Sequence, residues 1–405
     1  MKTLELNNLP VLTWNHLKVN HAAVDDAGEL FGPDFDPEQD TLLPGRRLSR
    51  GEAEELVSSA PRIPAESAQA GKIPEYGASG SPFFPTGLGA DYDRLLKEKG
   101  VLPVLTEIPA GRSDTPVIRR KAFGEGELFL DDGILVVGEG AKAEVITLLA
   151  GKAPSMPCGR RNPGNGGGPD GRGGPGADLN AGTAALRTRI ILRKGASLTF
   201  VRAQLLDEEY TCFDDIGAVL EEGAELKLIQ THLGAGRLYT GMQAYLAGRR
   251  SRLEADMCYR AAGIADANYT AVFGGRQTEA RMSFDGVLEE GAVKTFRDTL
   301  DFRAGASGAR GREEENVLLL SDSVVNRSVP LILCGEEDVD GQHAATLGRL
   351  PEDMLFYFAS RGIDRESAVR MMAGARLSKA ALRIPEEKTA AEVLSFIRQV
   401  NRGDK

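Results

Sequence analysis

The densest group of chemically reactive side chains lies between Cys334 and His343. This stretch contains a thiol, an imidazole and four carboxylates, which belong to Glu336, Glu337, Asp338 and Asp340. A cysteine, a histidine and carboxylates together can bind a soft or borderline metal ion. The spacing of Cys334 and His343, however, matches no standard zinc motif. Composition alone therefore favours a solvated acidic turn, with a metal site as the alternative.

The remaining cysteines and histidines are scattered along the chain. They are Cys158, Cys212, Cys258, His16, His21 and His232. Cys212 and Cys258 fall in or beside apparent strands, where packing in the core is the expected role of a cysteine. His232 follows a strand and is expected at its rim or in the core, whereas the two N-terminal histidines are expected to be structural. The chain contains no CxxC pair, catalytic Ser-His-Asp frame, HExxH, GxSxG or dinucleotide-binding fingerprint.

The composition excludes several classes of protein. Among 405 residues, 59 acidic and 49 basic side chains give a net charge of −10, which argues against a broad basic surface for nucleic acid. No apolar run approaches the ~20 residues of a membrane span, and the first residues lack the pattern of a secretory signal. With 4 widely separated cysteines, the cytoplasm is the expected compartment. Neither a membrane nor a nucleic acid is expected as a partner.

Short strands punctuated by glycine occupy the middle of the chain. A charged residue followed by Gly-Ala leads into alternating apolar and polar positions three times, and shortened forms occur twice more. The glycines of these five turns are Gly140, Gly195, Gly223, Gly291 and Gly305. Alternation with a period of two predicts half-buried strands, and the 28-residue step from Gly195 to Gly223 is typical of stacked repeats. Because no helical pattern separates the strands, we predict a mainly β protein with a right-handed parallel β-helix, and an antiparallel sandwich is the alternative.

Three regions are predicted along the chain. Residues 1–104 form an irregular and partly helical N-terminal region, 105–349 form the β-helix core, and 350–405 form a C-terminal helical region. Within the core, residues 157–178 consist almost wholly of Gly, Pro, Asn, Asp and Arg, and we expect a flexible loop there. A phosphate-binding loop is not supported, because no Lys-Ser/Thr pair follows at the required spacing.

Capping signals locate the helices that flank the core. An N-terminal helix is expected from about Ser49, with Glu52 completing a capping box, and another ends near Gly100. In the C-terminal region we expect a first helix to begin near Pro351, a second to be capped by Asp364, and a third to follow Pro385.

The run from Gly341 to Asp364 resembles a signature of the SufB/SufD family of iron–sulfur cluster assembly scaffolds. In that family a His-x-Ala-Thr segment is followed by an acidic-Leu-Phe-Tyr helix and then by Ser/Gln-Arg-Gly-Ile. Segments 9–20, 316–322 and 330–333 are also similar to the family. The resemblance implies a parallel β-helix with helical C-terminal parts, in agreement with the strand pattern.

The resemblance is closer to the SufD type than to the SufB type. SufB-type members flank the histidine with two glutamates, whereas Gln342 and Ala344 occupy these positions here. SufB-type members also carry a cysteine at a place that corresponds to the region of Glu315, where this chain has none. The SufD-type acidic-acidic-Val segment matches residues 337–339, and the histidine that follows is also present. The SufD-type cysteine, however, is replaced by Gly341.

The resemblance implies a scaffold subunit without catalytic activity of its own. Such a subunit pairs with a SufB-like subunit through the β-helix and with a SufC-like ATPase, which hydrolyses the ATP, through the C-terminal helices. His343 would contribute a ligand to a transient iron–sulfur cluster at the subunit interface, and Glu337 and Asp338, by their proximity in sequence, would orient it. No family role transfers to Cys334, which stays an additional candidate ligand. The sequence does not decide whether a flavin binds.

Two other functions remain open from the sequence. One is a SufB-like homodimeric scaffold in which Cys334 is an unusual ligand, and a homodimer in isolation is compatible with the SufD type too. The other is a β-helix enzyme that acts on polysaccharide through carboxylates along a groove. The low aromatic content of 6% leaves few sugar-binding platforms for such an enzyme.

Overall fold

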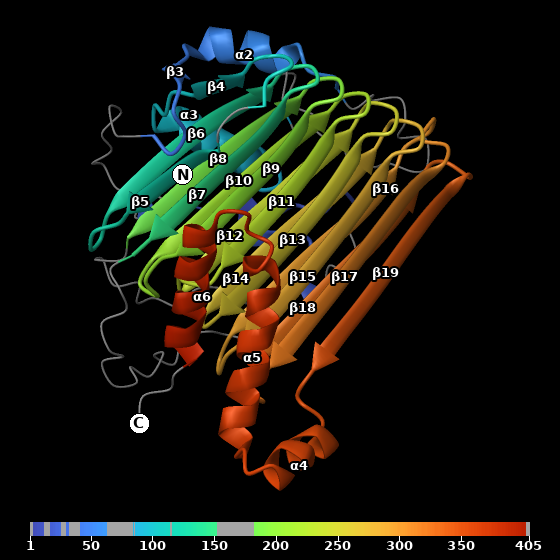
Figure 1. Ribbon diagram of the computed structural model, residues 1–405. Coiled ribbons are helices and arrows are strands. Elements are labelled where there is room, and N and C mark those ends of the chain that lie inside the picture. Colours follow the sequence, from blue (N-terminus) through green and yellow to red (C-terminus); the bar gives the residue numbers. More distant parts are fainter. Residues whose placement is uncertain are drawn as a thin grey trace.

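Two parallel β-sheets face each other through most of the chain, and their strands alternate along the chain to form a solenoid (Figure 1). The computed structural model describes residues 3–11, 17–25, 30–31, 41–62, 84, 86–113, 116–151 and 182–401. The predictions for His16, Cys158 and the 157–178 loop lie outside these residues. Among the described helices, none is long and apolar enough to cross a membrane.

Each turn of the solenoid adds one strand to each sheet, so that strands alternate between the two sheets along the chain. The first sheet contains, in spatial order, β18 (Val325–Cys334), β16 (Val293–Phe302), β14 (Ile264–Phe273), β12 (Arg237–Leu246), β10 (Thr211–Leu220), β8 (Thr183–Leu192), β6 (Leu128–Val137), β4 (Val104–Ile108) and the antiparallel β3 (Arg46–Arg47). The second sheet contains β19 (Val339–Gly348), β17 (Ala309–Leu319), β15 (Glu279–Leu288), β13 (Arg252–Ala261), β11 (Glu225–His232), β9 (Ser197–Leu205), β7 (Lys142–Ala150) and β5 (Val117–Ala122). The predicted parallel β-helix is confirmed, and the sandwich alternative is wrong.

The turns that lead from the first sheet to the second stack on one another. The N–H of Gly195 donates to the carbonyl of Glu222 in the next turn at 2.8 Å, and Gly195 has a φ of 64°. This left-handed conformation explains why glycine recurs at this position. Two turns place Arg250 and Gln277 there at φ 60° and 57°, which hides the repeat in the sequence. The repeat at Gly291 lies in a turn that runs back to the first sheet, between β15 and β16, and so belongs to a different series.

Aliphatic side chains and Phe200 fill the space between the two sheets in the N-terminal half of the solenoid, and further aromatic rings join them in the C-terminal half. The rings are Tyr259, Tyr269, Phe273, Phe284, Phe296 and Phe302. Phe273 and Phe302 stack with their centroids 4.3 Å apart. Identical positions in successive turns therefore form continuous columns of core side chains.

The N-terminal region covers the outer face of the first sheet. Its elements are β1 (Thr3–Leu6), β2 (Ala22–Asp25), α2 (Arg50–Ser58) and α3 (Ala90–Glu98). The antiparallel pair β1–β2 and helix α3 pack against Phe213 and Tyr239, whereas α2 packs against Ile134 and other residues of the same face. Helix α2 begins after Ser49, which forms the predicted capping box with Glu52.

Two of the three C-terminal helices, α5 (Arg365–Ala381) and α6 (Glu387–Asn401), cover the outer face of the second sheet (Figure 1). The third is α4 (Glu352–Ser360). Asp364 caps α5 as predicted, because its carboxylate accepts the N–H of Ser367 at 2.8 Å. Leu377 of α5 and Val393 of α6 belong to the apolar layer against the sheet, whereas α4 extends away from the solenoid (Figure 1).

The two ends of the sheets differ in chemistry. In the described part of the chain, no strand pairs with the outer edges of β18 and β19, and these two strands contain one Lys or Arg, which is Arg327. At the other end, β3 covers β4, and β5 carries Arg119, Arg120 and Lys121. Arg120 also pairs with Glu386 beside α6 at 3.0 Å. Basic side chains on an edge strand oppose pairing with another strand.

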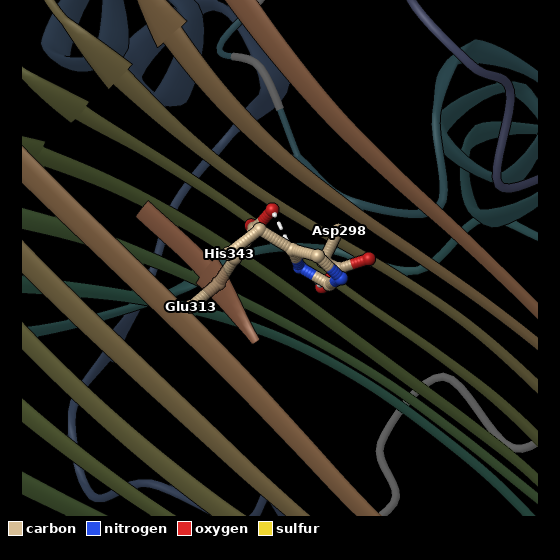
Figure 2. A group of neighbouring side chains, drawn as sticks. All are labelled: Asp298, Glu313 and His343. Carbon is tan, nitrogen blue, oxygen red and sulfur yellow. Dashed lines mark ion pairs between the residues drawn. The ribbon is translucent and has the colours of Figure 1, made fainter. Parts of the chain in front are cut away.

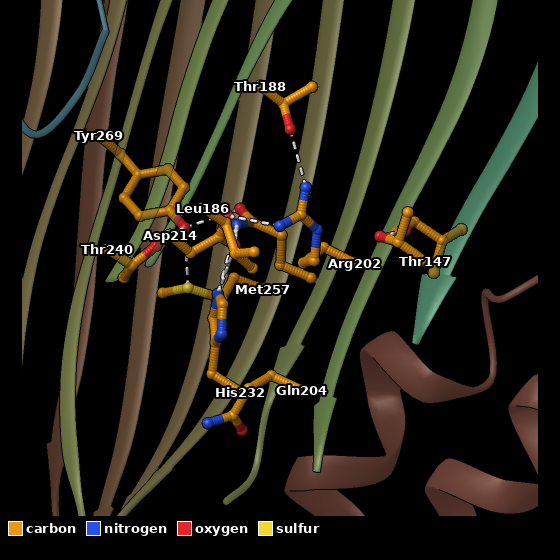
Figure 3. A network of polar contacts seen from close by, with 12 residues as sticks. Thr147, Leu186, Thr188, Arg202, Gln204, Asp214, His232, Thr240, Met257 and Tyr269 are labelled. Carbon is orange, nitrogen blue, oxygen red and sulfur yellow. Dashed lines mark hydrogen bonds and ion pairs between the residues drawn. The ribbon is translucent and has the colours of Figure 1, made fainter. Parts of the chain in front are cut away.

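A buried polar network interrupts the apolar interior near the middle of the solenoid (Figure 3). Asp214 accepts hydrogen bonds from Arg202 and Gln230, both at 3.1 Å. The Nε2 atom of His232 lies 3.6 Å from Asp214 and 3.3 Å from Gln230. The hydroxyl of Tyr269 donates to Gln230 at 2.7 Å. His232 is therefore a fully buried core residue.

We predict that His232 makes the stability of the fold sensitive to mild acid. Burial lowers the pKa of His232 to about 4, compared with ~6.5 in the unfolded chain. Between these values the unfolded state binds more protons, so stability is lost as the pH falls through this window. Urea unfolding of wild-type protein should show a loss of about 2 kcal/mol between pH 7 and pH 5 from this group alone.

The measurement is the difference in this pH dependence between wild type and a His232→Gln variant. His232→Gln should remove the loss, even if it changes the stability at pH 7. The matched control is His21→Gln at an exposed position, which should behave as wild type. Equal pH dependence in all three proteins would show that His232 is not buried in its neutral form.

Candidate metal centre

The last strand of the second sheet places His343 at the open end of the space between the two sheets. His343 in β19 pairs in register with Glu313 in β17. In β17, Ala309 and Val317 point into the core, and the period of two directs Glu313 and Glu315 to the same side. The inward residues of β17 consequently include ionisable groups at the positions that Met282 and Phe284 occupy in the preceding turn.

Three side chains converge at this end of the interior: Asp298, Glu313 and His343 (Figure 2). The Nδ1 atom of His343 lies 3.4 Å from a carboxylate oxygen of Glu313 and 3.8 Å from one of Asp298. Asp298 comes from β16 in the facing sheet and reaches across the interior. One ligand atom from each of the three residues lies within 4.8 Å of the others. Within the described ranges, this is the one group of three or more such side chains close enough to share a metal ion.

The carboxyl groups of Asp298 and Glu313 are both buried without hydrogen-bond donors. The side chains of Asp298 and Glu313 are 1% and 0% exposed, and none of their four oxygens has a hydrogen-bond partner. Burial, together with the charges of Asp298 and Glu315, raises the pKa of Glu313 to about 10. Burial and the charge of Glu315 raise the pKa of Asp298 to about 7. Without a bound cation, burial and repulsion between the two negative charges therefore favour the protonated form of each group.

His343 is the accessible member of the group. Its side chain is 25% exposed, and partial burial lowers the pKa of the imidazole. A neutral imidazole has a free nitrogen lone pair, which is the form that binds a metal. The site is therefore closed on the carboxylate side and open on the imidazole side.

A second ionic group lies beside this site in the interior. The ammonium of Lys294, which is fully buried, pairs with Glu315. Glu315 also accepts hydrogen bonds from Ser328 at 2.6 Å and from Tyr259 at 3.2 Å. Because Lys294 is engaged by Glu315, it does not serve as the direct counter-ion of the two carboxyl groups beside His343.

The structure locates the other predicted site residues elsewhere. Asp338 accepts a hydrogen bond from Ser307 at 2.7 Å, Glu337 lies on the same loop, and neither forms a hydrogen bond or ion pair with His343. Cys334 is a free, exposed thiol at the end of β18 and does not belong to the three-residue group. The orienting role of Glu337 and Asp338 stays a prediction without a supporting contact.

Asp298 and Glu313 were not identified from the sequence, although a signal for them exists. In β16, Asp298 has the same phase as Phe296 and Leu300, which are core residues. In β17, Glu313 has the same phase as Val317. A carboxylate at an apolar phase of a predicted strand marks a buried charge, and buried charges concentrate at functional sites.

The segment that carries this site matches a known protein family. Residues 175–376 match the family model for the SUF system FeS cluster assembly, SufBD core domain. The iron–sulfur cluster assembly protein SufD of Bacillus subtilis (strain 168) is 32% identical over 123 residues, which are 30% of this chain and 28% of the relative. SufB of the same organism is 23% identical over 185 residues, 45% of this chain and 40% of the relative. A SufBD family protein of Synechocystis is 28% identical over 108 residues, 27% of this chain and 22% of the relative. Each match thus spans less than half of the relative's length.

We predict that removing either Lys294 or Glu315 alone destabilises the fold, because the remaining charge is buried without its partner. Lys294→Met should lower the free energy of unfolding by about 3–5 kcal/mol, because Glu315 is left as a buried charge without its cation. The double variant Lys294→Met/Glu315→Gln should recover most of this loss. Urea unfolding of the two single variants and the double variant measures the coupling directly. Single variants whose costs simply add in the double variant would contradict a buried ion pair.

Proposed function

The chain belongs to the SufB/SufD family of the SUF iron–sulfur cluster assembly system, and on this premise we propose that it works as a SufD-type scaffold subunit. In this function it pairs with a SufB-like subunit and a SufC-like ATPase while a nascent cluster forms. The observation that carries the proposal is the position of His343, at the open end of the solenoid within the segment that matches the family model.

The SufD type is favoured over a SufB-like homodimer by the sequence around the site. The histidine lacks the flanking glutamates of the SufB type, and the place of the SufB-type cysteine is near Glu315, which is bound to Lys294. Of the two Bacillus subtilis relatives, SufD is the more similar, with 32% identity compared with 23% for SufB. Membership of the family also argues against an enzyme acting on polysaccharide.

We propose the outer edges of β18 and β19 as the surface for the SufB-like subunit. These strands have unpaired edges in the described part of the chain, and Ile332 and Leu347 expose apolar side chains there. A partner at this edge would cover His343 and bring the thiolate ligands that the described part of this chain lacks around its imidazole. Without that partner, we expect the same edge to support a homodimer. The cytoplasm stays the proposed compartment on the sequence grounds given above.

His343→Ala should impair cluster formation while leaving the complex assembled. The change removes the imidazole ligand but does not alter the strand edges that are proposed to contact the partner. The chain is co-expressed anaerobically with SufB-like and SufC-like subunits, and iron and sulfide are measured per purified complex. We expect a several-fold loss of both. An unchanged cluster content in the intact complex would remove His343 from the proposed site.

Two further variants serve as comparisons in the same experiment. His21→Ala changes an exposed histidine in the N-terminal region and should leave the cluster content unchanged. Glu337→Gln/Asp338→Asn tests the orienting role predicted from the sequence. Since neither carboxylate contacts the imidazole, we expect wild-type cluster content.

We propose helix α4 as the main contact for the SufC-like ATPase. Phe356 and Tyr357 on this helix are 75% and 53% exposed, and large exposed aromatic residues are common anchors of interfaces. Helices α5 and α6 instead use their apolar side chains to cover the second sheet. Removing the whole C-terminal region would therefore uncover the sheet as well as remove the contact.

Substitution on α4 tests the ATPase contact without this complication. Phe356→Ser/Tyr357→Ser should raise the dissociation constant for the SufC-like ATPase by about 10-fold or more. The dissociation constant is measured by titrating the ATPase over the immobilised chain. Leu382→Ser, at a 70% exposed leucine beyond the end of α5, is the matched control and should bind normally. Wild-type affinity in the α4 variant would move the contact elsewhere.

A further inference from the structure

We propose that Asp298, Glu313 and His343 bind one ferrous ion within this chain alone, without a ligand from a partner. The inference rests on the proposed function for its choice of iron, and it deepens that function by naming the ligands and the form in which iron is bound. The three residues come from adjacent elements of a rigid solenoid, β16, β17 and β19. No partner residue is needed to bring their ligand atoms within 4.8 Å of one another.

Within the described residues, Asp298 and Glu313 are the buried carboxyl groups in which both oxygens lack a hydrogen-bond partner. Asp214 and Glu315 also lie inside the solenoid, and both oxygens of each accept hydrogen bonds or ion pairs. The four oxygens of Asp298 and Glu313 accept no hydrogen bond, and their ionic neighbour is the imidazole of His343, although buried polar atoms are nearly always satisfied. These four unpartnered oxygens converge on the imidazole, where a cation would satisfy them.

The formal charge of this local group, once its carboxyl groups have released their protons on metal binding, matches a divalent cation. Asp298, Glu313 and Glu315 carry three negative charges when ionised, and Lys294 carries one positive charge. Together these side chains have a formal charge of −2, and His343 adds none in its neutral form. A divalent cation therefore balances the group.

The chemistry of the ligands narrows the choice of metal. Two carboxylates and one imidazole are hard-to-borderline ligands that suit Fe²⁺, Mn²⁺, Co²⁺ or Zn²⁺ rather than a soft ion. Three protein ligands leave further coordination positions open on the exposed side of the site, beside His343. Cys334 lies outside the group, because it pairs with Phe302 whereas Asp298 pairs with Pro330. This offset of four residues is about 13 Å along a strand.

The test is metal binding by the purified full-length chain without partner subunits, under anaerobic conditions. Fe²⁺ is titrated in competition with a chelator, and Co²⁺ serves as a spectroscopic probe of the ligand type. We expect one site per chain and a Co²⁺ spectrum of oxygen and nitrogen ligation without a thiolate charge-transfer band. Asp298→Asn and Glu313→Gln should each weaken Fe²⁺ binding by about 100-fold or more.

The neighbouring residue provides a matched control. Glu314→Gln changes a carboxylate on the same strand that points away from the interior, and it should bind Fe²⁺ as wild type does. Thermal unfolding with and without Fe²⁺ verifies folding: the metal should raise the midpoint of wild type and Glu314→Gln but not that of Glu313→Gln. Cys334→Ser tests the exposed thiol directly.

Several results would overturn the inference. They are the absence of a saturable site in wild type, equal binding by Glu313→Gln and Glu314→Gln, or a thiolate band that disappears in Cys334→Ser. If the isolated chain binds no Fe²⁺ but His343→Ala abolishes cluster formation in the complex, this inference fails and the proposed function stands. If the isolated chain binds Fe²⁺ through Glu313 but His343→Ala leaves cluster content unchanged, the proposed function fails and the metal site stands.

Discussion

The in-register pairing of parallel strands is the constraint on which the rest of the molecule depends. Each strand pairs with the strand of the same sheet one turn earlier, as Ser197 with Glu225 and Glu313 with His343. A shift of one residue would move every core side chain of a strand to the outer face. The stacked turn hydrogen bonds, such as that from Gly195 to Glu222, hold this register from one turn to the next.

The same register determines where ionisable side chains are found in the interior. In the middle of the solenoid, Asp214 is buried among several hydrogen-bond donors. Nearer the end, Glu315 is neutralised by Lys294. Beside the last strand, where His343 is partly exposed, both oxygens of Asp298 and of Glu313 lack hydrogen-bond donors. The least compensated charges therefore lie where solvent, ions or a partner subunit can reach them.

Sequence patterns predicted the architecture well because its signals are local. The Gly-Ala turns, the alternation of strands and the Ser49 and Asp364 caps each depend on a few consecutive residues, and the structure confirms them. The site was predicted only in part. Glu337 and Asp338 are near His343 in sequence, but five residues of extended chain span about 17 Å. Asp298 and Glu313 are distant from His343 in sequence. Glu313 lies beside His343 because their strands pair in register, and Asp298 reaches both from the facing sheet.

The difference between the two ends of the sheets has a consequence for the size of an assembly. A solenoid with two adhesive ends can add copies head to tail without limit and form a fibre. Here the end at β5 presents Arg119, Arg120 and Lys121, whereas the end at β18 and β19 presents few charges. If the proposed surface at β18 and β19 is the interface, only one end of the solenoid is suited to pairing. Contact through that end would then close after a single partner has been added, and the assembly would be a discrete pair.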